Sequence, residues 1–147
     1  MKKVFIAAAL GFILTSVSLA QFGQNKVNYK DFEWFYIQTR HFDIYFSKGG
    51  EKIAEFTAAA AEDALNHLQK DINYQVNSRI TLIVYNSHND FQETNVTDEY
   101  TGKGVGGFTE PFKNRVVFPF EGSYKKFQHV IAHELVHAVM RDMYFGG

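Results

Sequence analysis

The 147-residue chain contains no cysteine, only 2 prolines and no surplus of basic residues. Without cysteine it cannot form disulfides, and it cannot be anchored to a membrane through a lipid-modified cysteine. Its formal net charge is −1, and no block of like charge occurs along it. Nucleic-acid partners require a concentrated basic surface, so we expect none here.

The first 20 residues have the pattern of a cleaved export signal. Two lysines precede an apolar run over residues 4–14, and Ser18 and Ala20 occupy the −3 and −1 positions of a cleavage site. The run is too short for a comfortable membrane span, which needs about 20 residues. The pattern predicts that residues 1–20 are removed and that the protein is periplasmic, secreted or in the cell envelope, meeting the membrane only during export. An uncleaved anchor is the weaker alternative.

Residues 21–147 are enough for one domain with a single core. Apolar periodicity predicts strands at residues 41–46, 79–85, 105–109 and 114–120, with 32–37 as either a short strand or a packing segment. It predicts helices at residues 51–70, directly after Ser87, and from Ser123 through the following apolar stripe. The nearly unbroken apolar run at 79–85 indicates a central strand buried on both faces. With the last two strands as a hairpin, the expected order is β-α-β-α-β-β-α, an α+β fold with helices packed on a mixed sheet.

The most informative stretch is His133-Glu134-Leu-Val-His137, within the last predicted helix. Residues four apart share one face of a helix, so His133 and His137 can converge on a single zinc ion. Glu134 lies beside that ion without binding it and can accept a proton from metal-bound water. A shuffled chain of this composition would contain the pattern about 0.015 times, so chance explains it poorly. A buried helix with two hydrogen-bonded histidines is the alternative.

The other histidines do not extend this site. His129 shares the face of His133 and His137, but eight helical residues separate 129 from 137 by about 12 Å, too far for one ion. We interpret His129 as a packed or supporting residue. His41, His67 and His88 fit no metal-ligand spacing.

The last third of the chain resembles the N-terminal half of a gluzincin-type zinc metallopeptidase domain, thermolysin-like and peptidase MA-like. Such domains occur in exported bacterial proteins, where they can precede a TolB-like β-propeller. The resemblance covers about residues 100–145, and the earlier part only by element order. The segments that carry it are Val105-Gly-Gly-Phe-Thr109, Asn114-Arg-Val-Val-Phe-Pro119, Gly122-Ser-Tyr124 and His133-Glu134-Leu-Val-His137.

The resemblance implies a role for each matching residue. His133 and His137 match two zinc ligands, and Glu134 matches the general base. Edge-strand residues that hold an extended peptide substrate are matched by Val105, Gly106, Gly107, Phe108 and Thr109. The glycines at residues 101–107 lack the spacing of a phosphate-binding loop. They indicate instead a strand whose backbone another group approaches closely. The exposed backbone groups of such an edge strand can pair with an extended peptide.

The third zinc ligand of gluzincins is a glutamate on a later helix. The sequence stops ten residues after His137, so we expect that ligand, and the C-terminal half of the domain, beyond residue 147. The chain alone is then expected to be inactive and to expose part of its motif helix. Metzincins are excluded because Met140 and Met143 stand where that family has a glycine and its third histidine. Asp142 is not expected to be the third ligand either, because it turns off the helix face that carries His133 and His137. We expect no ligand among the acidic residues upstream, Glu93, Glu99, Glu110 and Glu121.

Two functions follow. The first is an exported zinc-dependent peptidase that hydrolyses peptide bonds in peptide or protein substrates. The alternative is a non-catalytic binding or assembly module of a larger cell-envelope protein that retains a metallopeptidase fold. An intact Glu134 favours the first, because a purely structural metal site does not need a base.

Overall fold

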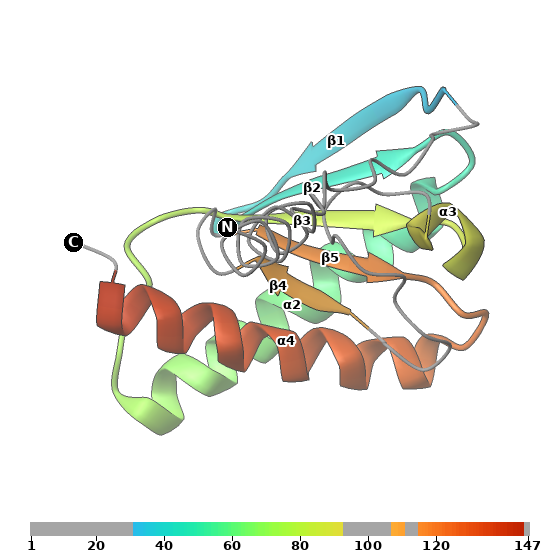
Figure 1. The fold of residues 1–147 in the computed structure, drawn as a ribbon. Coiled ribbons are helices and arrows are strands. Elements are labelled where there is room, and N and C mark those ends of the chain that lie inside the picture. The colour runs from blue at the N-terminus through green and yellow to red at the C-terminus, as the bar shows by residue number, and fades with distance from the viewer. Residues whose placement is uncertain (1–30, 93–106, 111–114, 146–147) are drawn as a thin grey trace, which may run out of the picture.

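The computed structural model describes residues 31–92, 107–110 and 115–145, so the predicted export signal lies outside the described part. Within these ranges five strands form one mixed sheet with three helices packed around it (Figure 1). The strands are β1 (Trp34–Gln38), β2 (Phe42–Ser47), β3 (Ile80–Tyr85), β4 (Phe108–Glu110) and β5 (Arg115–Pro119). The helices are α2 (Glu51–Ile72), α3 (His88–Gln92) and α4 (Tyr124–Phe145). The predicted α+β class is confirmed, and the aromatic run at 32–37 forms a strand.

The sheet has the order β1-β2-β3-β5-β4. Its three inner strands are parallel, and the two outer strands run antiparallel to their neighbours. Helix α2 connects the parallel strands β2 and β3, whereas β4 and β5 form the predicted hairpin. Pro119 is the last residue of β5, and a strand end is a position where proline is tolerated. This order places β4 at one edge of the sheet.

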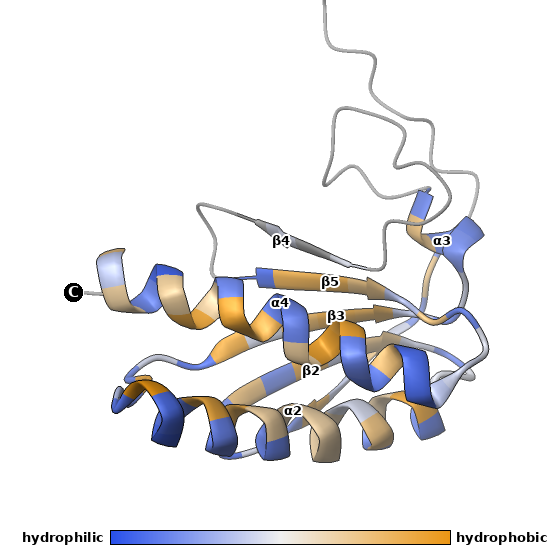
Figure 2. Cartoon of the chain, turned by 90° about the horizontal axis from the view of Figure 1, so that it is seen from below, coloured by the Kyte–Doolittle hydropathy of each residue, from blue (hydrophilic) through white to orange (hydrophobic). Residues whose placement is uncertain are grey.

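Helices α2 and α4 lie side by side on one face of the sheet (Figures 1 and 2). Their apolar sides and that face form the main core, which includes Phe42, Leu65, Leu82, Phe118 and Leu135, each almost fully buried. Along α2, polar residues line the side turned away from the sheet (Figure 2). None of the helices in the described part of the chain is long and apolar enough to cross a membrane.

Strand β3 occupies the predicted central position, but the prediction of burial on both faces is only half correct. Ile80, Leu82 and Val84 are fully buried under the helices. Thr81 and Ile83 point to the opposite face and are half-buried. The reason is that α3 and a small cluster of apolar side chains around Tyr85 and Phe91 cover this second face, rather than long helices.

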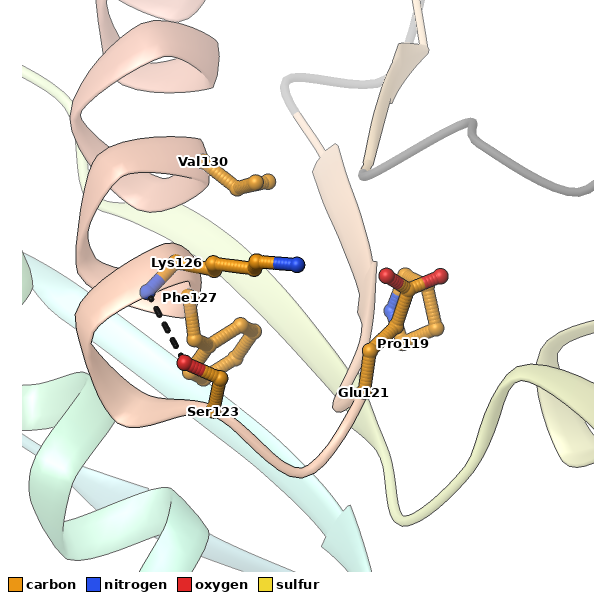
Figure 3. A pocket seen from close by; sticks show the side chains of 6 residues that line it. All are labelled: Pro119, Glu121, Ser123, Lys126, Phe127 and Val130. Carbon is orange, nitrogen blue, oxygen red and sulfur yellow. Dashed lines mark hydrogen bonds between the residues drawn. The ribbon is translucent and has the colours of Figure 1, made fainter.

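The register of α4 is set at its first turn. The Lys126 backbone N–H donates to Ser123 Oγ at 3.4 Å (Figure 3). Ser123 is therefore the N-cap of α4, as predicted. The expected apolar stripe then faces the core, with Phe127, Ile131 and Leu135 buried and Val130 partly buried. Because the stripe is fixed against the sheet, the position of each motif residue around the helix is fixed too.

Asp142 turns away from the motif histidines, as predicted, and its side chain is buried. It accepts hydrogen bonds from the Tyr74 hydroxyl at 3.1 Å and the Ser78 hydroxyl at 2.8 Å. These bonds tie the connection between α2 and β3 to the last turns of α4. Asp142 therefore has a structural role and is no candidate ligand.

Replacing Asp142 with alanine is expected to lower the free energy of unfolding by about 2 kcal/mol, because two hydroxyls lose a charged acceptor in a buried position. Urea denaturation measures this difference. Asp71→Ala is the matched control, since Asp71 is exposed near the end of α2, and its change should stay within about 0.5 kcal/mol. Equal stability of the two variants would contradict the structural role of Asp142.

Candidate metal centre

His133 and His137 lie one turn apart on α4, both exposed to solvent. Their Nε2 atoms are 3.3 Å apart. The two rings are nearly perpendicular, with centroids 5.0 Å apart and an interplanar angle of 75°. The helix therefore directs the same nitrogen of each ring into one shared space.

The spacing of these nitrogens fits a tetrahedral zinc ion. Two Zn–N bonds of about 2.05 Å that meet at the tetrahedral angle place their nitrogens about 3.3 Å apart. The observed Nε2–Nε2 separation is the same. Within residues 31–92, 107–110 and 115–145, no third histidine, cysteine or carboxylate joins the pair. The described residues thus fit two of the three protein ligands that a catalytic zinc requires.

Glu134 follows His133 and points toward strand β4. Its side chain is half-buried, and Oε2 accepts a hydrogen bond from Thr109 Oγ1 at 2.8 Å. The carboxylate is therefore held against the sheet edge by Thr109. This arrangement suits a group that acts on a reactant next to a metal rather than one that binds the metal.

Gly107, directly before β4, allows the strand to come this close to α4. A Cβ at this position would lie 3.0 Å from Glu134 Cγ and 3.0 Å from Phe118 Cδ1. Both distances are tighter than ordinary Cβ contacts, so the Glu134 and Phe118 side chains would have to move by a few tenths of an ångström to admit a Cβ here. The expected close approach to this backbone is seen at Gly107, where Glu134 and Phe118 are the approaching side chains.

The five predicted substrate-binding residues are only partly described. Phe108 and Thr109 belong to β4 and Gly107 precedes it, while Val105 and Gly106 lie outside the described residues. Among described strands, β4 pairs only with β5, so no described strand occupies its other edge. Sequence reasoning placed Thr109 among the substrate contacts and did not anticipate its bond to Glu134. A sequence signal for this contact was available: side chains alternate between the two faces of a β-strand, so residues 107 and 109 lie on the same face.

The remaining histidines of the described chain lie elsewhere. His41 Nδ1 is 2.7 Å from Glu62 Oε2, His67 contacts the Asp63 carbonyl, and His88 contacts Gln92. Burial raises the pKa of the Glu62 carboxyl, but hydrogen bonds from His41 and Thr39 outweigh burial and hold it below its ordinary value. Each of these three histidines contacts a neighbouring group away from the histidine pair of α4. His129 is exposed on α4.

The upstream acidic residues were not expected to supply a ligand. Glu121 lies 3.6 Å from His88 Nδ1, in the loop between β5 and α4, and is not part of the site. Glu93 and Glu99 lie outside the described residues, as does the side chain of Glu110.

An apolar groove of about 280 Å³ lies between the last turns of α2 and α4. Met140 and Tyr144, at 47% and 68% exposure, follow His137 along α4 at helical spacing. The lining residues are Leu68, Ile72, Val136, Val139, Met140, Met143 and Tyr144. The exposed apolar surface is thus continuous with the histidine pair.

A scan of protein-family models finds none that matches the chain, and a search of curated proteins finds no similar sequence.

Proposed function

We propose that the protein is an exported zinc-dependent peptidase domain of the gluzincin type, acting on peptide or protein substrates. The observation that carries the proposal is the geometry of the motif on α4. His133 and His137 present two nitrogens 3.3 Å apart, and the adjacent Glu134 carboxylate is held 2.8 Å from a hydroxyl of the edge strand. A structural metal site needs the histidines but gives no reason for an oriented carboxylate beside them.

The chain supplies three functions in this proposal. His133 and His137 hold a zinc ion, which when bound would polarise the scissile carbonyl and acidify water. Glu134 takes a proton from the attacking water and passes it to the nitrogen that leaves as the C–N bond breaks. The edge of β4 away from β5 pairs with an extended peptide, whose backbone then passes close to Glu134.

The site requires one more protein ligand, which in this proposal comes from outside the described residues, on a C-terminal half of the domain. The apolar surface of Met140, Met143 and Tyr144 beside His137 supports such a covering half. The alternative, a binding or assembly module in the cell envelope, would keep the fold without turnover.

Hydrolysis of a denatured protein tests the proposal. The full-length protein with zinc should cleave unfolded casein, because an extended chain can pair with β4. Treatment with 1,10-phenanthroline should stop cleavage, and added zinc should restore it. Quenched-fluorescent peptides measure the rates. Cleavage that persists in the chelator would exclude zinc catalysis, and zinc binding without any cleavage would favour the binding module.

A further inference from the structure

We propose that Thr109 is a positioning residue for Glu134, an inference that rests on the peptidase function proposed for the site. The Thr109 hydroxyl lies 2.8 Å from Glu134 Oε2 and 3.5 Å from the Glu134 backbone oxygen. A hydroxyl has one proton to donate, and the shorter contact to a charged oxygen is the stronger bond. The bond therefore goes to the carboxylate.

The contact connects two elements that are distant in sequence. Thr109 lies in the edge strand β4, and Glu134 lies in α4, 25 residues later. Both side chains are half-buried, so water competes less for the bond than at an exposed position. Gly107 lies on the same side of the chain and makes room for Glu134 Cγ. Gly107 thus allows Glu134 to lie close to the strand, and the Thr109 hydroxyl can then donate to the Glu134 carboxylate.

The bond fixes one end of a flexible side chain. A free glutamate samples several rotamers, and it loses this freedom whenever it must act in one position. With Oε2 held by Thr109, that ordering is complete before a substrate arrives. Because the same strand is the proposed substrate edge, the base and the peptide are positioned by one element. The Thr109 side chain then serves the base, and the substrate is bound by backbone groups of β4.

Two substitutions separate the hydroxyl from the shape of the residue. Thr109→Val removes the donor and keeps the volume, whereas Thr109→Ser keeps the donor. For Thr109→Val we expect kcat to fall roughly 10- to 100-fold, as for other residues that orient catalytic groups. KM and zinc affinity should stay unchanged, and Thr109→Ser should retain most of the activity. Thr81→Val, the same change in β3 away from α4, is the matched control and should leave kcat unchanged.

A second measurement does not depend on turnover. NMR scalar couplings of the Glu134 side chain in the metal-free protein report its rotamers. They should show one rotamer in the wild type and in Thr109→Ser, and averaging in Thr109→Val. An inactive wild type would contradict the peptidase function, while these couplings would still decide the role of Thr109. Unchanged couplings in Thr109→Val, or a raised KM with normal kcat, would overturn the proposal; the second result would make Thr109 a substrate contact.

Discussion

Replacing Glu134 with glutamine is expected to remove nearly all peptidase activity while zinc stays bound. Glutamine has the length of glutamate and still offers an oxygen to the Thr109 hydroxyl, so the side chain should keep its place. An amide cannot take up the proton of the attacking water, and loss of a general base costs roughly 10²- to 10⁴-fold in rate. The histidines are untouched. The measurements are kcat on a quenched-fluorescent peptide and zinc content by mass spectrometry.

Glu55→Gln is the control for this experiment, because Glu55 is exposed on α2 and its change removes the same charge far from the site. It should behave as the wild type in both measurements. Full activity in Glu134→Gln would remove Glu134 from the mechanism. Loss of zinc from that variant would show instead that the carboxylate is needed to hold the metal, which the observed distance to Thr109 does not suggest.

The motif helix could be predicted closely because its signals are local. Ser123 as N-cap and buried residues from Phe127 to Val139 are properties of one continuous segment. The spacing of His133 and His137 then follows from helix geometry, and the structure places their nitrogens as two zinc ligands would lie. Propensity and periodicity act over a few residues, so they are sufficient for such a segment.

Contacts between segments could not be predicted in the same way. The bond between Thr109 and Glu134 depends on β4 pairing with β5 at the sheet edge and on α4 packing under that edge. Strand alternation puts residues 107 and 109 on one face, but it does not indicate that Glu134 lies opposite them. The half-exposed face of β3 has a similar cause, since an apolar run does not state what covers each side. Sequence reasoning predicted the histidine pair as metal ligands, and the fold adds a hydrogen bond to the proposed base.

The proposed centre also predicts what happens when a ligand is removed. His133→Ala and His137→Ala should each weaken zinc binding roughly 100-fold. Structural zinc sites with four ligands are worth about 10–16 kcal/mol, or about 3 kcal/mol per ligand, which corresponds to that factor. Competition with a fluorescent zinc chelator measures the dissociation constant. The double variant should bind no zinc above the background of other exposed histidines.

His129→Ala provides the matched control, because His129 is an exposed histidine on the same helix. It lies two turns before His137, about 12 Å along the axis, and cannot share an ion with it. Its zinc affinity should equal that of the wild type. If His133→Ala held as much zinc as His129→Ala, the metal would lie elsewhere, and the 3.3 Å spacing of the two nitrogens would be a coincidence of helix geometry. If only the two motif variants lose zinc, the ion is assigned to one face of α4, beside the carboxylate that Thr109 holds.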